Sequence, residues 1–275
     1  EFSNHLAMVE KNNRYGYIRN SGKIIIDIKL KEADPFSENL AAVKINNKWG
    51  FINNKGEIII ENKFDNARSF SEGLAAINIG GKGQSYKFSG GKWGYIDRKG
   101  NISIEPQFDE AQPFLADNGL TTVQIGEKEG FIDSTGEIVI NPQFDSVSHF
   151  TDDGLAAVCN NNKCGFINAE GEIVIPLQFD DVGGFSNGFA WVAVDVVKPS
   201  GTFKKLESAR IGYINTNGEF VIQPDLTSTD SYTPRSGDFS EDGYAIVQVG
   251  DLQGIIDKNG DFLIEPQYER ISDFP

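Results

Sequence analysis

Apolar residues in this chain fall in short runs rich in Val, Ile, Phe and Tyr, and each run is bounded by Asn, Gly, Asp or Pro. Runs of this length and composition between turn-forming residues are typical of β-strands. Nothing in the chain carries a helical period over ten residues. The pattern therefore predicts an all-β protein.

One stretch shows the expected elements most clearly. The predicted strands, called here the first to fourth strands of a repeat, are Leu40–Ile45, Lys48–Asn53, Glu57–Ile60 and Phe64–Phe70. Asn46 and Asn47 join the first two, because Asn accepts the positive φ of a tight hairpin turn. Gly56 supplies the same freedom between the second and third. Each repeat is thus an antiparallel meander of four strands, the content of a small propeller blade.

The same phrase recurs along the chain and is marked each time by a Gly at the middle of the second strand. The markers are Gly16, Gly50, Gly94, Gly130, Gly165, Gly212 and Gly254. Self-similarity at a period of about 35–45 residues is the signature of a solenoid, a propeller or an array. We expect residues 1–275 to form one domain, a seven-bladed β-propeller.

Ring closure is expected from the two ends of the chain. The sequence begins at a first strand, Leu6–Glu10, and ends with an unattached fourth strand, Tyr268–Phe274. Pairing of that last strand with the first repeat would close the ring and remove open sheet edges. An open β-repeat superhelix and a set of separate β domains remain the alternatives.

Charge narrows the range of partners. The chain has 25 Lys and Arg against 40 Asp and Glu, a formal net charge of -15. This balance disfavours nucleic acid and anionic membranes, and no apolar run approaches the ~18 residues that cross a bilayer. We expect a monomer with a protein or glycan partner and no direct membrane insertion.

The phrase GLAAVKINNKWGFIN, a composite of the second and neighbouring repeats, resembles the bacterial WG-repeat family over essentially the whole chain. The resemblance implies repeat modules of exported or surface-associated bacterial proteins, with binding rather than catalysis as their role. It therefore implies an extracytoplasmic or surface-associated location, with the export signal outside this chain.

The chain departs from that pattern at the residue before the marker Gly. Trp stands there only at Trp49 and Trp93, and the substitutes are Tyr15, Glu129, Cys164, Ile211 and Gln253. This variation argues against a Trp ligand platform. We expect these side chains to cover the sheet face between blades and the Gly to permit a bulge or close backbone approach.

Three insertions point to a binding face: Ile79–Gly91, Asp195–Arg210 and Leu226–Gly237. In a meander, connections between first and second strands and those after the third strand emerge at the same end. We therefore hypothesise a face that captures a protein segment or a glycan, and the alternative is a structural spacer. The candidate ligand-binding residues are Tyr86, Lys87, Phe88, Phe203, Lys204, Lys205, Arg210 and Tyr232.

An acidic residue opens the fourth strand in five repeats. These residues are Asp65, Asp109, Asp145, Asp180 and Glu269. If the fourth strands line a channel, the carboxylates could form a ring that holds calcium, the one cofactor this sequence suggests. The alternative is that each Asp hydrogen-bonds the backbone of its own turn.

Catalytic signatures are weak. His5 and His149 fall at unrelated repeat positions, and the sequence has neither a Ser, His and Asp arrangement nor a Cys and His cluster with metal-ligand spacing. We predict that the chain is not an enzyme. A metal-dependent hydrolase is the distant alternative.

Cys159 and Cys164 are the two cysteines of the chain. By repeat alignment they match Lys44 and Trp49, which oppose each other in a non-hydrogen-bonded pair of a hairpin. A cross-strand disulfide fits that spacing, and two reduced thiols are the alternative.

Overall fold

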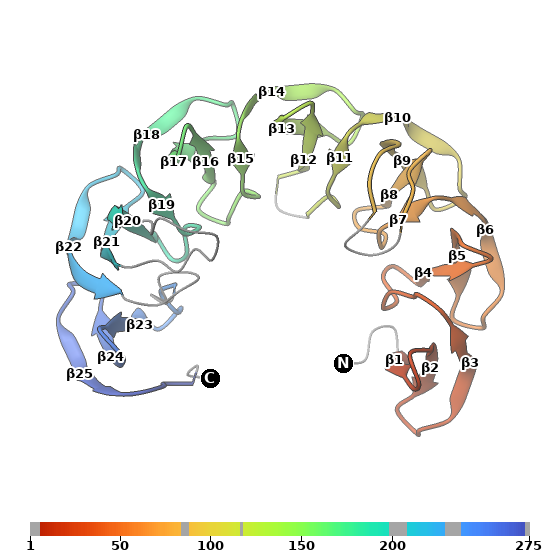
Figure 1. Ribbon diagram of the computed structural model, residues 1–275, viewed down its shortest axis with the longest axis horizontal. Coiled ribbons are helices and arrows are strands. Elements are labelled where there is room, and N and C mark those ends of the chain that lie inside the picture. Colours follow the sequence, from red (N-terminus) through yellow and green to blue (C-terminus); the bar gives the residue numbers. More distant parts are fainter. Residues whose placement is uncertain (1–5, 84–87, 116–117, 198–207, 229–237, 273–275) are drawn as a thin grey trace. The chain divides into compact units, whose positions relative to one another are not determined.

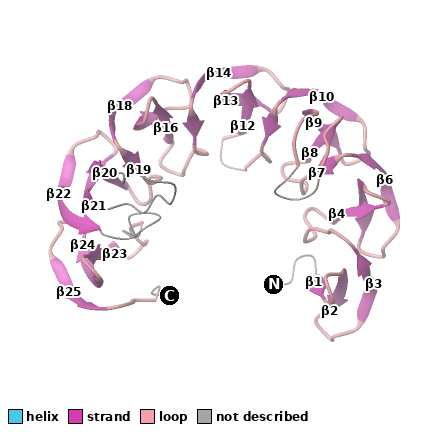
Figure 2. Cartoon of the chain, in the orientation of Figure 1, coloured by secondary structure: helices cyan, strands magenta, loops and turns pink. Residues whose placement is uncertain are grey.

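A computed structural model describes residues 6–83, 88–115, 118–197, 208–228 and 238–272. Across these residues the chain consists of strands, turns and loops, with no helix (Figure 2). Consecutive strands pair antiparallel in seven sheets of three or four strands (Figure 1). The expected all-β class is confirmed.

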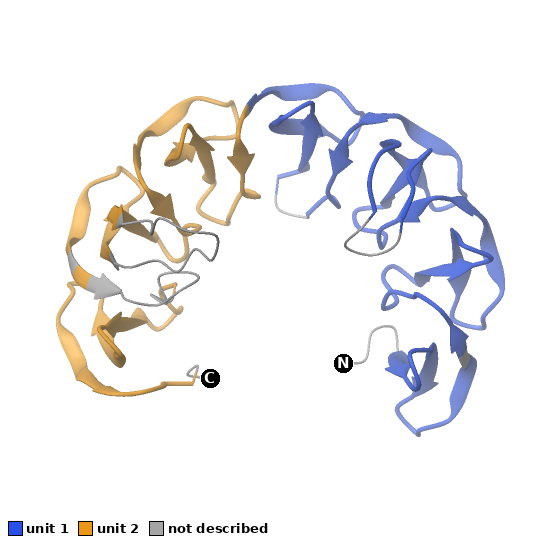
Figure 3. Ribbon diagram, viewed as in Figure 1, with its two compact units in different colours: residues 1–143 blue, residues 144–275 orange. Residues whose placement is uncertain are grey.

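The chain divides into two compact units, residues 1–143 and residues 144–275 (Figure 3). The strands of the first unit, grouped by sheet, are β1 (Leu6–Glu10), β2 (Tyr15–Arg19) and β3 (Ile24–Leu30); β4 (Leu40–Ile45), β5 (Lys48–Asn53) and β6 (Ile58–Phe64); β7 (Asn66–Ala67), β8 (Leu74–Ile79), β9 (Lys92–Asp97) and β10 (Ile102–Phe108); and β11 (Glu110–Ala111), β12 (Leu120–Ile125), β13 (Lys128–Asp133) and β14 (Ile138–Phe144).

The second unit continues the pattern. Its strands are β15 (Ser146–Val147), β16 (Ala156–Asn160), β17 (Lys163–Ile167) and β18 (Ile173–Phe179); β19 (Asp181–Val182), β20 (Phe189–Val197), β21 (Ser208–Asn215) and β22 (Phe220–Ser228); and β23 (Tyr244–Val249), β24 (Leu252–Asp257) and β25 (Phe262–Tyr268).

The first two predicted strands of the sample repeat are β4 and β5, with the expected bounds. Asn46 and Asn47 both have positive φ, 52° and 63°, as the predicted hairpin turn requires. The expected third and fourth strands were wrong in length. The third extends to Phe64 as β6, and the fourth is reduced to the two residues of β7. β7 pairs with β8, so the fourth strand of one repeat joins the sheet of the next.

The reason for the longer third strand is a bulge opposite the marker glycine. Trp49 pairs with Phe64 and Phe51 pairs with Ile60, so the extra residues Glu61–Lys63 lie across from Gly50. A Cβ at Gly50 would stand 2.5 Å from the carbonyl oxygen of Ile60. Only a residue without a side chain permits that approach, so the expectation of a bulge at the marker Gly is confirmed.

Both faces of β4 are buried, because neighbouring sheets pack face to face within a unit. Leu40 and Ala42 contact the cluster that includes Ile77 of the next sheet. Ala41 and Val43, on the opposite face, lie in the cluster of the preceding sheet. This two-sided burial explains why the first strands are apolar runs and do not alternate.

The Asn or Asp that ends the second strand shapes the next turn. In Asp97, Oδ1 accepts hydrogen bonds from the backbone N–H groups of Lys99 and Asn101, at 2.8 and 2.9 Å. Asn53 makes the same contacts to Lys55 and Glu57. This Asx motif accounts for the N or D at this position of the phrase, which six of the seven repeats keep and Arg19 of the first repeat replaces.

After β25 the chain forms no strand over residues 269–272, and the last residues of the expected closing strand lie outside the described residues. Ring closure therefore remains a prediction.

Candidate binding site

A cavity of about 390 Å³ lies in the first unit. Its walls come from residues of the first three sheets and of the connections between them. Most of the lining is aromatic or charged, and Ala33, Asn66 and Ala67 complete it. The aromatic residues are Tyr15, Trp49, Phe88 and Trp93, and the charged residues are Glu32, Asp34, Lys44 and Arg68.

Three of the aromatic residues occupy the same repeat position. Tyr15, Trp49 and Trp93 each precede a marker Gly, on β2, β5 and β9. Trp49 and Trp93 are 7% and 2% exposed, so they pack mainly between sheets, as expected. In these two repeats the position therefore belongs to the core and also lines the cavity.

The fourth aromatic residue comes from the insertion between β8 and β9. Phe88 packs edge-on against Trp93, with ring centroids 6.3 Å apart. The base of the insertion is tied down by the buried Asn78, which accepts a hydrogen bond from the Gly81 N–H at 3.0 Å and donates to the Gly90 carbonyl at 3.2 Å. These bonds hold the insertion against the sheet and position Phe88 in the cavity wall.

Two of the charged residues, Lys44 and Glu32, form an ion pair with each other. Lys44 Nζ donates to Glu32 Oε1 at 2.9 Å and lies 5.8 Å from the Trp49 ring centroid. The Lys44 side chain is 5% exposed. A buried amine needs such a partner, because an unpaired charge away from water is costly.

Arg68 is the second cation, and it is only partly satisfied. Its guanidinium lies over Trp93, 5.0 Å from the ring centroid, and an Nη atom is 3.5 Å from Glu110. Its Nε is shielded from solvent and has no hydrogen-bond partner in the structure. Stacking on Trp93 therefore fixes the orientation of a guanidinium that still has a donor to offer.

The remaining acid, Asp34, is held in an unusual state. Burial raises its pKa to about 6, although Arg68 nearby opposes the rise, and Glu32 adds to it. Its backbone carbonyl accepts a hydrogen bond from the Tyr17 hydroxyl at 2.6 Å. At neutral pH, Asp34 is thus a largely ionised carboxylate in a poorly hydrated place.

Of the candidate residues named from the sequence, Phe88 lies in this cavity. Arg210 belongs to the second unit, where its Nε donates to Asp195 Oδ2 at 2.9 Å. The others lie outside the described residues: Tyr86, Lys87, Phe203, Lys204, Lys205 and Tyr232.

Sequence reasoning missed most of the lining. The signal available was the departure of Lys44 and Arg68 from the pattern of other repeats, beside the two retained Trp residues.

The acidic residues before the fourth strands are engaged between repeats. Asp109 accepts from Lys92 of the preceding sheet at 2.6 Å and from the Gly126 N–H of its own sheet at 2.8 Å. The hydrogen bond from Lys92 lowers the Asp109 pKa. The corresponding contacts are Asp65 with Lys48 and Gly80, Asp180 with Lys163 and Val196, and Asp145 with Asn161.

These hydrogen bonds differ from the alternative of a bond to the backbone of the same turn, because each Asp accepts from a backbone N–H 15 to 17 residues further along the chain. Glu269 is exposed. Among the described residues no group of three or more His, Cys, Asp and Glu side chains is suited to a metal ion.

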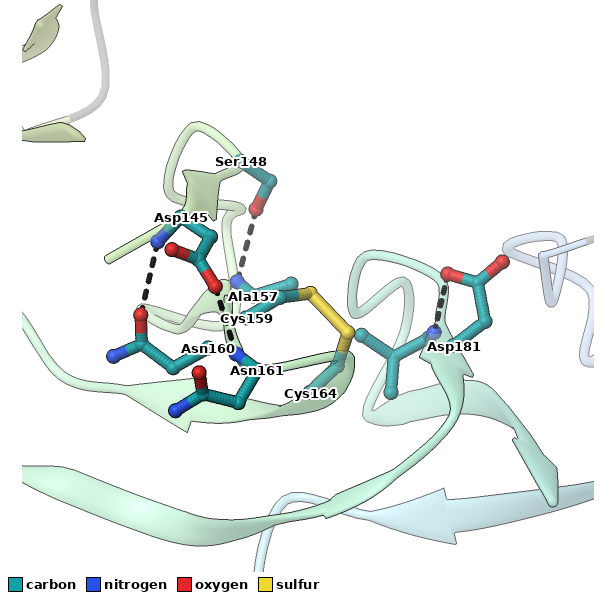
Figure 4. Close-up of a disulfide and its surroundings, with 9 residues drawn as sticks. Asp145, Ser148, Ala157, Cys159, Asn160, Asn161, Cys164 and Asp181 are labelled. Carbon is teal, nitrogen blue, oxygen red and sulfur yellow. Dashed lines mark hydrogen bonds between the residues drawn. A yellow bond between two sulfur atoms is a disulfide. The ribbon is translucent and has the colours of Figure 1, made fainter. Parts of the chain in front are cut away.

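Cys159 and Cys164 form a disulfide in the structure (Figure 4). They are paired residues of β16 and β17, with Cα atoms 4.1 Å apart. The adjacent turn is held by a hydrogen bond from the Asn161 N–H to Asp145 Oδ2 at 2.7 Å. The disulfide therefore crosslinks the two strands of the β16–β17 hairpin.

Comparisons with known proteins point to the architecture. The WG containing repeat matches residues 15–49, 49–82, 93–128, 130–164, 165–195, 211–252 and 254–275, well over half of the chain. No curated protein matches the sequence. Within the described residues no helix is long and apolar enough to cross a membrane.

Solved structures of β-propeller-like proteins resemble the chain. A eukaryotic initiation factor is similar with a TM-score of 0.59 and 11% identity, over 95% of this chain and 74% of that one. AztD of Citrobacter koseri gives a TM-score of 0.48 and 11% identity, over 97% and 80%. At such identities a likeness shows the fold alone, and the match to the initiation factor supports a β-propeller-like repeat fold.

Proposed function

The chain belongs to the WG-containing repeat family, and from that premise we propose that it is a non-catalytic binding module that captures a protein segment or a glycan. The observation that carries the proposal is the cavity between the first three sheets. Its volume of about 390 Å³ lies in the range of roughly 300–1,000 Å³ that binding pockets occupy.

The chemistry of the lining favours binding over catalysis. Lys44 and Glu32 neutralise each other at 2.9 Å, and Arg68 is stacked on Trp93. General acid or base catalysis needs a group free to exchange a proton with substrate, and among the charged lining residues Asp34, whose pKa burial raises to about 6, is the one with that character. The three other charges are fixed by each other or by an aromatic ring, which suits them to orienting a ligand.

The position of the insertion supports the same function. Phe88 enters the cavity wall from a connection that is much longer than the Asn46–Asn47 turn of the preceding repeat. Loops carried on a rigid scaffold are where binding residues concentrate. A structural spacer does not require an inserted loop, nor the hydrogen bonds from Asn78 that order the base of this one.

We also propose an oxidising, extracytoplasmic or surface-associated location in a bacterium, with the protein acting as a monomer. The Cys159–Cys164 disulfide supports the compartment, because such bonds persist mainly outside reducing cytosol.

The test replaces the insertion by a natural turn of the same protein. Residues 78–92 are exchanged for Gln-Ile-Gly-Glu-Lys, the sequence of residues 124–128, in which Gln124 Nε2 already satisfies the Gly126 carbonyl at 3.0 Å. The matched control exchanges Asn46–Asn47 for Gly-Glu, which alters a turn without removing a cavity wall.

Parent, exchange variant and control are applied to peptide and glycan arrays. The proposal expects at least one array class to bind parent and control, with a loss of more than roughly tenfold in the exchange variant. Absence of binding to either array, or equal binding by all three proteins, would favour the spacer.

A further inference from the structure

The charges that line the cavity balance. Glu32 and Asp34 face Lys44 and Arg68, so the lining offers no net charge to select an ion. The protein as a whole has a formal charge of -15, which repels acidic ligands at long range. The cavity therefore suits an uncharged ligand better than an acidic one.

The positions over the Trp49 and Trp93 rings, where a cationic ligand could bind, are occupied by side chains of the protein. Cations bind aromatic residues over the ring face. Lys44 lies over Trp49 and Arg68 lies over Trp93, at 5.8 and 5.0 Å from the ring centroids. The protein's own cations thus already lie over the two Trp rings of the lining.

The cavity instead offers donors and acceptors side by side. The Arg68 guanidinium is a partly exposed donor, and its direction is fixed by the stacking on Trp93. The Asp34 carboxylate is the nearby acceptor, and its pKa of about 6 reflects incomplete compensation for burial. A ligand hydroxyl accepts one hydrogen bond and donates another, so it can satisfy both groups.

The aromatic part of the lining complements such a ligand. Tyr15 and Phe88 are half-buried and belong to different repeats, so they present apolar surface from separate sheets. Amphipathic aromatic side chains pack against a ligand at little cost in conformational entropy. Hydroxyl groups joined to apolar C–H faces are the defining chemistry of a sugar ring.

We propose that this cavity is a subsite for a neutral saccharide, in which the partly exposed guanidinium of Arg68 donates to a sugar oxygen and Asp34 accepts from a sugar hydroxyl. Phe88 packs against the ring. The inference rests on the proposed binding function and narrows it from a protein segment or glycan to a neutral glycan.

Tryptophan fluorescence provides the readout, because two of the three Trp residues in the chain line the cavity. The full chain is titrated with neutral oligosaccharides of gluco, galacto and manno configuration and with N-acetylglucosamine oligomers. Oligogalacturonate, a glutamate hexapeptide and a lysine hexapeptide form the charged arms. The Arg68→Gln and Phe88→Ala variants are compared with Arg98→Gln, which removes an equal charge outside the cavity lining.

At least one neutral oligosaccharide is expected to bind, with a Kd raised more than tenfold in Arg68→Gln and in Phe88→Ala and less than twofold in Arg98→Gln. Thermal melting of each variant checks the fold, and Phe88→Ala keeps the test valid if Arg68→Gln unfolds. Failure of every neutral arm, or binding that both cavity variants retain, overturns the inference. If a charged arm binds in the cavity instead, the binding function stands and the saccharide assignment fails. If none of these ligands binds in the titration and neither array shows binding, the proposed binding function is wrong as well.

Discussion

At the scale of the residue, the Trp and the Gly of the repeat motif have separate roles. The aromatic position packs between sheets and accepts substitutes of several kinds, such as Cys164 and Ile211, which are both buried. The Gly position accepts none, because the bulge of the third strand occupies the space that a side chain would need. The bulge therefore explains the constancy of the Gly, whereas the preceding position tolerates several side chains that can pack between sheets.

Gly94→Ala should be strongly destabilising. The added Cβ would stand 2.5 Å from the Ile104 carbonyl oxygen and 2.6 Å from Pro106 N, and backbone atoms cannot yield as a flexible side chain can. We expect a loss of roughly 2–4 kcal/mol in the free energy of unfolding, measured with urea. Gly184→Ala is the control, since its nearest neighbour is a Thr151 methyl at 3.3 Å. Equal losses in the two variants would contradict the bulge explanation.

Asp34 should make stability depend on pH. Burial raises its pKa to about 6 in the folded protein, above the 3.8 of an exposed Asp. The folded state therefore holds this proton more tightly, and the contribution is complete below pH 4 and is lost as the pH rises through 6. The parent should lose roughly 2 kcal/mol more than Asp34→Asn between pH 4 and 7 in urea unfolding. Parallel pH profiles would show that Asp34 is not responsible.

Single residues of the site were harder to predict than the fold. Phe88 was found because an insertion interrupts the repeat, and Trp49 and Trp93 were assigned to the core, where they largely lie. Arg68 was overlooked, because a charged side chain after a short strand is usually solvated. Its stacking on Trp93 depends on a contact across the sheet that no local pattern encodes.

At the scale of the element, the hairpins were predicted well and the third strands were not. A first and second strand are joined by a tight turn, and their register follows from Asn46 and Asn47. The third strand continues past its bulge to Phe64, and the residues of the bulge look like a strand end in the sequence. The fourth strand is shorter than expected because the chain leaves the sheet edge soon after Ala67.

The disulfide should add modest stability to one hairpin. Cys159 and Cys164 are five positions apart, and closing so short a loop contributes roughly 2 kcal/mol in the chain-entropy treatment. Reduction, or replacement of both residues by Ser, should lower the free energy of unfolding by about that amount without loss of the β-sheet circular dichroism signal.

The intact mass of protein recovered from its native compartment tests the bond directly. A mass larger by two hydrogens than that of the disulfide form would show two free thiols and contradict the prediction. If reduction unfolds the whole protein, the disulfide contributes more to stability than the modest amount predicted.

At the scale of the whole molecule, each sheet depends on its neighbour. Hydrophobic clusters join consecutive sheets within a unit, and pairs such as Lys92–Asp109 add a polar link at 2.6 Å. Exposed ion pairs contribute about 0–1 kcal/mol each, so the clusters carry most of the stability. The repeat count was evident from the marker glycines, whereas ring closure depends on contacts between distant parts of the chain.

Closure predicts a role for the residues after β25. Deleting residues 270–275 should lower the melting temperature by several degrees, because the first sheet, β1–β3, would lose a fourth strand. The deletion also removes the hydrogen bond from the Ile271 N–H to Gln253 Oε1 at 2.6 Å. Gln253→Met removes that bond alone and is the control. A deletion no more harmful than Gln253→Met would argue for the open superhelix.

The central claim is that the chain binds its partner in the cavity of the first unit. Hydrogen–deuterium exchange, measured with and without an oligosaccharide or peptide that binds the parent, tests this most directly. Exchange should slow by more than about threefold at residues 31–34, 66–68 and 88–93, because a ligand in the cavity restricts local opening there. Slowing confined to the second unit, or to segments that do not line the cavity, would contradict the account.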